Sequence, residues 1–416
     1  MTPDRMEDAF IRRLSRLPGL YPSQFWLVFS GNLVSAVGLS MIWPFMMVYA
    51  AERLRLPLTA VGSLLTINAA FSVVASFAAG TLTDRVGRRG VMIVGMALHG
   101  VVYAFFGFAN SLWIFVILMA AGGFVSPIYR VGVDAMVADL IPEPKRVDAY
   151  ALLRMGNNVG VAIGPTLGGF LATRSYTIIF LCAASGLLLY SLLTLLFVRE
   201  TKPKEDADRP PAGEKLGGYL RVLGDRPFMA TFAGFTLATI GASLIFVLLA
   251  VYAKTQFGMP ESDYGLIMAA NAGMVVLFQV AVTRVSRRFP PFDVLAVGTL
   301  LYTVGVGSVA LGSSFFPFLA SMFVMTCGEL LLVPTTSALV ASMAPPDMRG
   351  RYMSIYGLSW QMASGIGPVF GGMLSDAIAP RAIWLGGAVV CLIGTGLFTI
   401  LGMRARRSVV RQSLPG

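Results

Sequence analysis

Twelve long apolar stretches, separated by short polar segments, constrain the fold of this 416-residue chain more than any other feature. A helix needs about 20 mostly apolar residues to cross the roughly 30 Å of hydrocarbon in a bilayer, and each stretch is close to that length. The strands of a membrane barrel would instead show about ten residues of alternating hydrophobicity. The pattern predicts an all-α integral membrane protein with twelve transmembrane helices. The expected spans are residues 24–51, 60–83, 91–109, 112–138, 148–172, 176–198, 228–252, 264–283, 293–312, 317–341, 353–375 and 382–403.

Charged residues are scarce and unevenly placed. They make up 13% of the chain, against roughly 25% in soluble globular proteins. With twelve spans, both tails, the central linker and the even-numbered loops share one face, where 25 of the 32 Lys and Arg residues fall, while five fall on the other face. Cytoplasmic loops carry such an excess, so we expect both termini in the cytoplasm. The net charge of +11 is therefore explained by the orientation of the chain in the membrane, and no nucleic-acid partner is expected.

The longest polar interruption, residues 199–226, divides six spans from six. Its composition predicts a linker, with a short surface helix near Glu214 to Leu223. The expected divisions are an N-terminal cytoplasmic tail at 1–23, a bundle at 24–198, a cytoplasmic linker at 199–226, a second bundle at 227–403 and a C-terminal cytoplasmic tail at 404–416.

The two bundles carry an internal repeat. A shift of 203 residues aligns GPTLGG at 164–169 with GPVFGG at 367–372. One offset that serves both loops and helices predicts two pseudo-symmetric six-helix bundles that arose from a duplicated unit. The same shift pairs Pro142 with Pro345, Arg146 with Arg349, Gly62 with Gly265, Asn68 with Asn271 and Gly95 with Gly298.

Three motifs and this layout resemble one transporter family. The motifs are GTLTDRVGRRG at 80–90, VADLIPEPKR at 137–146 and GVAIGPTLGG at 160–169. Together with the repeated six-helix halves, they resemble the major facilitator superfamily, in particular its 12-helix drug:proton antiporter branch. The resemblance implies the major facilitator fold, in which two halves rock about a site near the middle of the membrane.

The resemblance also implies a function. We expect a secondary active transporter, not an enzyme, that works by alternating access and exports small hydrophobic or cationic compounds in exchange for protons. The alternative is a uniporter or symporter for a specific metabolite such as a sugar, amino acid or organic acid. The expected partners are the small-molecule substrate, protons and the lipid bilayer, with the chain acting as a monomer in the bacterial cytoplasmic membrane.

The charge cluster between the second and third spans is expected to act as a gate. By resemblance, Asp84 would face the N-terminus of the eleventh helix, near Arg349 to Ser354, where a helix dipole favours a negative charge. Arg88 would reach Asp139 at the end of the fourth helix. Topology alone is the alternative explanation for these arginines, in particular Arg85 and Arg89, because cytoplasmic loops are basic.

A few ionisable residues fall inside the expected spans, where their cost makes them functional candidates. Glu329 lies near the middle of the tenth span; the loss of hydration disfavours its charged form, which suits a proton-coupling group, and the alternative is a structurally hydrogen-bonded Glu. Asp134 and Arg130 are one helical turn apart. We expect Asp134 to form a buried pair with Arg154, with Arg130 as its third member or as a cation facing the cavity. This pair is either static or part of the gate.

Small residues on the fifth and eleventh spans indicate close helix packing. By resemblance the fifth-span segment would seal the interface between the halves, and packing alone is the alternative. The set is Gly160, Gly164, Pro165, Gly168, Gly169, Gly367, Pro368 and Gly371.

Polar and aromatic residues on spans that would face a central cavity are candidates for the substrate site, although any one of them could instead pack between helices. No metal site is expected, because His99 is the only histidine and has no ligand partner, and no P-loop or other cofactor motif occurs. The cavity candidates are Asn32, Trp43, Tyr129, Asn157, Asn158, Asn271, Trp360 and Gln361.

Overall fold

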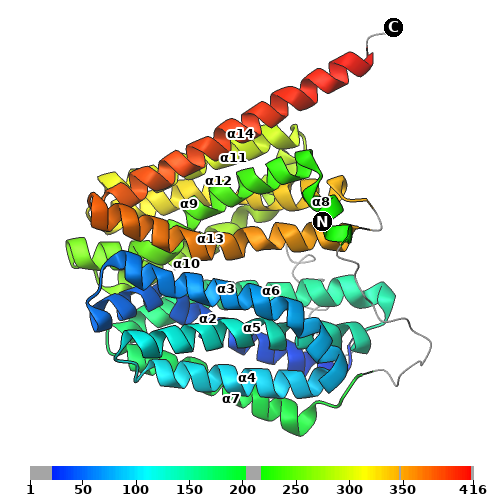
Figure 1. Cartoon of the computed structure of the whole chain (residues 1–416), viewed down its shortest axis with the longest axis vertical. Helices are drawn as coiled ribbons and strands as arrows, with labels where there is room; N and C mark the ends of the chain where they lie inside the picture. Colours follow the sequence, from blue (N-terminus) through cyan, green and yellow to red (C-terminus); the bar gives the residue numbers. More distant parts are fainter. Residues whose placement is uncertain (1–20, 203–216, 346–347, 414–416) are drawn as a thin grey trace, which may run out of the picture.

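The structure, a computed structural model, describes residues 21–202, 217–345 and 348–413. In Figure 1 the chain forms two groups of helices, one from blue to green and the other from green to red, stacked along the longest axis. The first group holds α2 (Ser23–Leu54), α3 (Leu58–Val86), α4 (Arg88–Phe106), α5 (Leu112–Leu140), α6 (Glu143–Ala172) and α7 (Tyr176–Phe197).

The second group has the same number of long helices. A short helix, α8 (Gly217–Leu223), precedes it and covers part of the surface helix expected near Glu214 to Leu223; residues 214–216 lie outside the described residues. The long helices are α9 (Arg226–Phe257), α10 (Glu261–Ser286), α11 (Pro291–Ser308) with the 3-10 turn η2 (Val309–Leu311), α12 (Phe315–Met343), α13 (Arg349–Ala377) and α14 (Ala382–Ser413).

The expectation of an all-α membrane protein with two six-helix halves is confirmed in the described residues. Ten helices are long and apolar enough to cross a membrane by length and composition. The other two long helices, α6 and α13, have 30 and 29 residues and carry more polar side chains. They also make the most extensive contacts between the halves, α6 with α10 and α13 with α3, and α2 meets α9 as well.

Several helix boundaries differ from the expected ones by a few residues, and the largest difference is at the C-terminus. The last helix was expected to end near residue 403, but α14 continues to Ser413 and projects beyond the other helices in Figure 1. The added segment contains no Gly or Pro, and its arginines, including Arg404 and Arg407, are good helix formers. Positive side chains near a helix C-terminus also interact favourably with its dipole.

The 203-residue repeat recurs in the packing. A Cβ atom added at Gly62 of α3 would lie 2.7 Å from the carbonyl oxygen of Pro368, and one added at Gly265 of α10 would lie 2.9 Å from that of Pro165. A shift of 203 residues converts the first pair into the second. The halves are therefore related by pseudo-twofold symmetry, and each uses the same small residue to approach the other.

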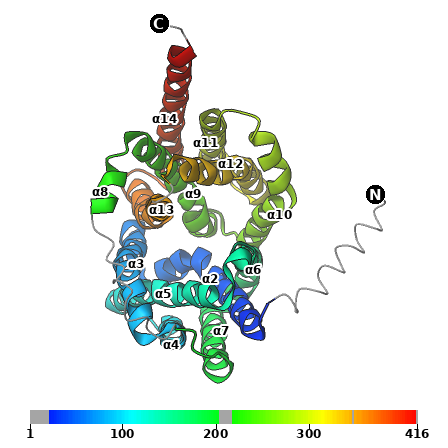
Figure 2. The same cartoon turned by 90° about the vertical axis from the view of Figure 1, so that its right-hand side faces the viewer.

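The central helices α2 and α9 are equivalent under this shift and are the most buried. Their apolar windows are 72% and 83% buried, whereas that of α10 is 22% buried. α2 packs on α6 and α7, and α9 packs on α13 and α14. The remaining helices surround this pair, as Figure 2 shows in a view along the helices.

Two ends of the molecule are distinguished below. The linker end holds the end of α7, the start of α9 and α8, and it faces the viewer in Figure 2. The far end holds the α2–α3, α6–α7, α9–α10 and α13–α14 connections. In the described residues, the hydrogen bonds and ion pairs that join the two halves all lie towards the far end.

Candidate functional site

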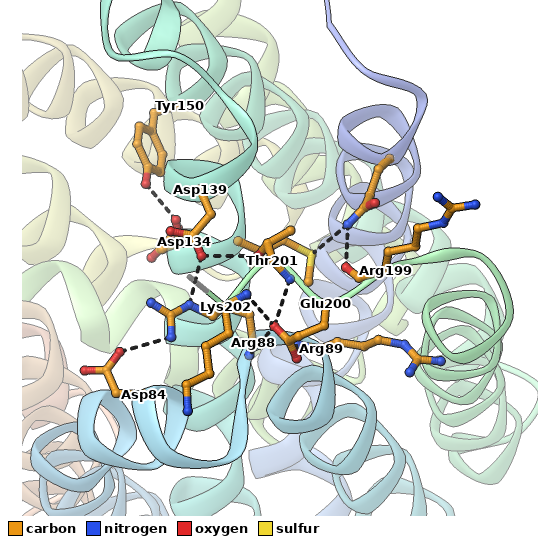
Figure 3. A network of polar contacts seen from close by, with 12 residues as sticks. Asp84, Arg88, Arg89, Asp134, Asp139, Tyr150, Arg199, Glu200, Thr201 and Lys202 are labelled. Atoms are coloured by element: carbon orange, nitrogen blue, oxygen red, sulfur yellow. Dashed lines mark hydrogen bonds and ion pairs between the residues drawn. The ribbon is translucent and has the colours of Figure 1, made fainter. Parts of the chain in front are cut away.

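Arg88 is the centre of an ionic network at the linker end (Figure 3). Its Nε lies 2.9 Å from Asp139 Oδ2, and its Nη1 lies 3.3 Å from Asp84 Oδ1. The side chain of Arg88 is 12% exposed, whereas that of Asp84 is 74% exposed. Arg88 therefore holds the ends of α3, α4 and α5 together, and the carboxylate of Asp84 stays accessible to another partner.

A second carboxylate, Glu200, fixes the turn between α3 and α4. Its Oε1 accepts a hydrogen bond from Arg88 N and its Oε2 one from Arg89 N, each at 3.1 Å. The N-cap of α4 is Gly87, which has no side chain to satisfy these amides, so Glu200 supplies the missing cap from the start of the linker. The same carboxylate accepts from the amides of Thr201 and Lys202 at 2.9 Å.

The charge of Glu200 and the conformation of Gly87 follow from this cap. Partial burial favours the neutral carboxyl, but the four backbone amides outweigh it and lower the pKa of Glu200 below its usual value near 4.5. Gly87 has φ +100°, and a Cβ atom there would lie 2.5 Å from Glu200 Oε2. The glycine of the GTLTDRVGRRG motif is thus required both by the backbone angle and by the carboxylate beside it.

The ion pair of Asp84 is with Arg88 of its own half, and in the described residues no hydrogen bond or ion pair joins it to α13, where we expected it near Arg349 to Ser354. Towards the linker end the facing helices are apart, because Cβ atoms added at Gly80 of α3, or at Gly350 or Gly357 of α13, would have nothing within 4 Å. The N-cap of α13, Met348, has no side-chain oxygen that could cap the helix. In this state, therefore, the start of α13 has no side-chain cap from Met348, and the Asp84 carboxylate has no bond to the other half in the described residues.

At the far end α3 and α13 are in close contact. Thr66 Oγ1 donates to the carbonyl of Gly365 at 2.6 Å. The carboxylate of Asp376, at the end of α13, accepts from Leu58 N at 3.1 Å, Thr59 N at 2.8 Å and Thr59 Oγ1 at 2.7 Å. These contacts close the halves on that side.

A lysine cluster joins the other helices of the far end. Lys254 Nζ of α9 lies 2.5 Å from Glu52 Oε1 of α2 and 2.5 Å from Glu261 Oε1 of α10. Tyr176 of α7 accepts from Lys254 at 3.1 Å and donates to Glu261. Lys254 thus has one acidic partner in each half. The pair with Glu52 and the two hydrogen bonds of Tyr176 would break if the halves separated there.

Glu329 lies between α10 and α12 inside the C-terminal half. Its Oε2 accepts from Asn271 Nδ2 at 2.9 Å, and the same amide donates to Thr326 Oγ1 at 2.8 Å. Asn271 is 7% exposed. The carboxyl group is thus half-buried and hydrogen-bonded, and no ion pair is formed by it in the described residues.

The expected buried pair between Asp134 and Arg154 is wrong for this structure. Both residues are exposed, and no ion pair joins them in the described part of the chain. Tyr150 donates to the carbonyl of Asp134 at 2.7 Å, so Asp134 is level with Tyr150, one turn before Arg154. Arg154 and Asn158 instead continue the face of α6 that carries Pro165. Arg130 is also exposed.

The glycines of α6 divide into two faces. Cβ atoms at Gly160, Gly164 and Gly168 would clash with α2, at 2.8 Å from Val37 N, 2.8 Å from Val37 O and 2.5 Å from Met41 O. Pro165 and Gly169 instead meet α10 of the other half, where a Cβ atom at Gly169 would lie 2.6 Å from Glu261 O.

The equivalent residues of α13 repeat this division. Cβ atoms at Gly367 and Gly371 would meet Ile240 and Leu244 of α9, while Pro368 meets Gly62 of α3. The motif therefore serves packing within each half and contact between the halves.

The expected cavity residues do not form one group. Tyr129 is 3% exposed and packs against Gly95 and His99, so its assignment to a cavity is wrong. Asn271 is engaged with Glu329 between helices. Of the others, Asn157, Asn158, Trp43 and Trp360 are exposed, Gln361 is half-buried, and Asn32 Nδ2 lies 3.5 Å from Leu153 O.

Sequence reasoning missed three charged residues with large roles in these contacts: Glu200, Asp376 and Lys254. One signal was available for the two acids. The residues before α3 and α4, Pro57 and Gly87, cannot cap a helix with a side chain, so a cap from elsewhere in the chain was required.

Comparison with known proteins places the chain in a family. The sequence pattern of the Major Facilitator Superfamily matches residues 28–315 and 231–414. A Na(+), Li(+), K(+)/H(+) antiporter of Planococcus maritimus is 27% identical over 391 residues, which cover 87% of this chain and 89% of that protein. Multidrug resistance protein 1 of Bacillus subtilis (strain 168) is 25% identical over 326 residues, which cover 78% and 83%.

Solved transporter structures share the fold of this chain. A bacterial homologue of the human lysosomal transporter Spinster, solved in an inward-facing and unoccupied conformation, superposes with a TM-score of 0.77 at 14% identity, covering 91% of this chain and 96% of that one. The chain therefore belongs to the Major Facilitator Superfamily, as a multi-pass secondary transporter of small molecules.

Proposed function

We propose that this transporter is a proton-coupled antiporter that exports small hydrophobic or cationic compounds. The observation that carries the proposal is Glu329, an acidic side chain within α12 that is half-buried beside Asn271 and has no basic partner in the described residues. Such a carboxyl group gains and loses a proton at a lower cost than one held in an ion pair. The multidrug resistance relative supports the substrate class.

The two ends of the molecule give the cycle a direction. We place the linker end in the cytoplasm, because it carries the basic loops. With the far end closed by α3, α13 and the Lys254 cluster, the described state then opens towards the cytoplasm. Export requires the opposite state, in which the linker end closes and the far end opens.

Asp84 is proposed to hold that opposite state. α3 and α13 are antiparallel, since Thr59 meets Gly372 while Gly62 meets Pro368. Continued along both helices at the same spacing, this pairing brings Asp84 to the start of α13. A carboxylate there would meet the uncapped amides of that helix, an interaction worth about 0.3–1 kcal/mol when exposed and up to about 2 kcal/mol when partly buried.

A second candidate function is the exchange of monovalent cations for protons. The cation antiporter of Planococcus maritimus, which covers a similar share of the chain as the multidrug relative, favours it. The same Glu329 would then exchange a proton for a metal cation instead of an organic one.

Purified protein in proteoliposomes with an imposed pH difference separates the candidates. We expect lipophilic cationic dyes to accumulate in the compartment from which protons leave, and this accumulation to be lost in Glu329→Gln. Accumulation of Na⁺ or K⁺ without dyes would favour the second candidate. Flux of a sugar or amino acid alone would reject both.

A further inference from the structure

The N-terminus of α3 is capped by the opposite half of the protein. Its own N-cap residue is Pro57, which makes no side-chain cap. The first amides of a helix need partners, and in this structure Asp376 of α13 supplies them for Leu58 and Thr59. Leu58 and Asp376 are 318 residues apart in the sequence and belong to different halves, so the cap exists only while the two halves touch at the far end.

We propose that Asp376 is the gating residue that holds the far end closed. It offers a full negative charge to a helix N-terminus, which the helix dipole favours, and both of its oxygens are used: Oδ1 by Leu58 N, and Oδ2 by the amide and hydroxyl of Thr59. When the far end opens, all three hydrogen bonds break together. Water then replaces Asp376 as the partner of these groups. The contact therefore favours the closed far end without introducing a steric clash in the open one.

This contact is the counterpart of the proposed contact of Asp84 at the linker end. α3 and α13 are antiparallel and each lacks a local cap, with Pro57 before one and Met348 before the other. α13 carries its acid near its C-terminus and α3 carries Asp84 near its own. At each of its two ends this helix pair thus has one carboxylate and one helix start without a cap of its own, and rocking makes one contact as it breaks the other.

The inference rests on the proposed alternating-access cycle but not on its substrate or coupling ion. Other far-end contacts would remain when Asp376 is changed, among them the ion pair of Lys254 with Glu52 between α9 and α2. Loss of the Asp376 cap should therefore shift the balance of states without abolishing the closed state.

The test measures the far end directly. Spin labels are placed at Arg174 and Arg381, exposed residues of the α6–α7 and α13–α14 connections, one in each half, after replacement of Cys182, Cys327 and Cys391. Distance distributions are recorded in lipid nanodiscs for the parent, Asp376→Asn and Asp376→Ala. We expect the fraction with a separated far end to rise by roughly threefold or more in both variants, while Asp376→Glu stays closer to the parent.

Matched controls separate gating from general damage. Asp263→Asn removes an acid at the same end that has no hydrogen bond to the other half in the described residues, and it should leave the distribution unchanged. Thr59→Val removes only the hydroxyl donor and should give a smaller shift in the same direction as Asp376→Asn. Equal thermal unfolding of the parent and Asp376→Asn would show that the shift is not a loss of folding.

An unchanged far-end distribution in both Asp376→Asn and Thr59→Val, in folded protein, would overturn the inference. This result is independent of the transport assays, because the distances require neither a substrate nor a pH gradient. If the exporter assignment failed while the distances shifted, the gating role of Asp376 would stand.

Discussion

Gly62 of α3 and Pro368 of α13 touch so closely that the side chain of any other residue at position 62 would meet the Pro368 carbonyl oxygen, 2.7 Å from an added Cβ. This is one of the closest approaches between the halves at the far end, together with those of Gly372 and Gly169. Gly80 lies five helical turns further along the same face of α3, where an added Cβ would meet nothing.

Replacement by alanine at Gly62 and at Gly80 should therefore have opposite effects on the balance between the two conformational states. Gly62→Ala should disfavour the described state by about 1–3 kcal/mol, since overpacking against a backbone atom cannot be relieved by a rotamer change. Gly80→Ala should leave this state unaffected and disfavour the one in which the linker end closes. Accessibility of single cysteines at the two ends to a water-soluble thiol reagent checks both, and equal behaviour of the two variants would contradict the prediction.

Asp84→Asn is expected to lower transport severalfold while expression and substrate binding stay near normal. The amide keeps the size of the side chain but removes the charge that the start of α13 would attract. Arg88 keeps its bond to Asp139, so the linker-end network should remain. Transport and equilibrium binding measured on the same preparation check this, and undiminished transport would remove the gating role of Asp84.

Glu329→Gln should abolish substrate accumulation driven by a pH difference. The substituted amide can still accept a hydrogen bond from Asn271, so the fold and substrate binding are expected to persist. Glu143→Gln, at the exposed start of α6, is a control that should transport normally. If the Glu329 variant accumulated substrate as well as this control did, another residue would have to carry the proton.

The cap formed by Glu200 has a predicted pH dependence. Because the pKa of Glu200 is lowered in the folded protein, its stabilising contribution is present above the usual value near 4.5 and is lost as the pH falls through the lower, folded pKa. Glu200→Gln offers one acceptor oxygen in place of two, and the loss of a helix cap costs about 1 kcal/mol.

Thermal unfolding of the parent and of Glu200→Gln at several pH values measures this contribution. The difference in Tm should be constant between about pH 6 and pH 8 and should shrink below about pH 4.5. Gly87→Ala should destabilise the protein at every pH, since its φ of +100° is unfavourable for alanine whatever the charge of Glu200. A Tm difference for Glu200→Gln that grew as the pH fell would contradict the assignment.

The sequence predicted those parts of the fold that repeat. The length of the hydrophobic stretches predicted the helices, and the 203-residue offset predicted two equivalent halves. The contacts of Gly62 with Pro368 and of Gly265 with Pro165 agree with this, because a duplicated unit packs in the same way twice. The pairing of Arg88 with Asp139 was anticipated by resemblance and is present. These features depend on local pattern and symmetry.

The other contacts join residues that are far apart in the sequence or depend on the exact level of two neighbouring helices, and no local sequence pattern indicates either. Asp134 and Arg154 were placed level with each other from the position of the turn between α5 and α6, but a difference of one helical turn brings Tyr150 beside Asp134 instead. Asp376 and Glu200 bind backbone amides, which are the same for every residue type and leave no complementary side chain in the sequence. Their partners became visible only when the helices were placed in space.

The central claim is that the two halves rock, so that one end closes as the other opens. Spin-label distances at both ends of the protein, with Asp84 and Asp376 unchanged, test it most directly. One pair of labels is placed at Arg174 and Arg381 at the far end, and the other at Lys145 and Arg288 at the linker end. The distances are recorded in nanodiscs at pH values on either side of neutrality. The account predicts that a rise in far-end separation accompanies a fall in linker-end separation. Two ends that open together, or that stay fixed while transport proceeds, would contradict it.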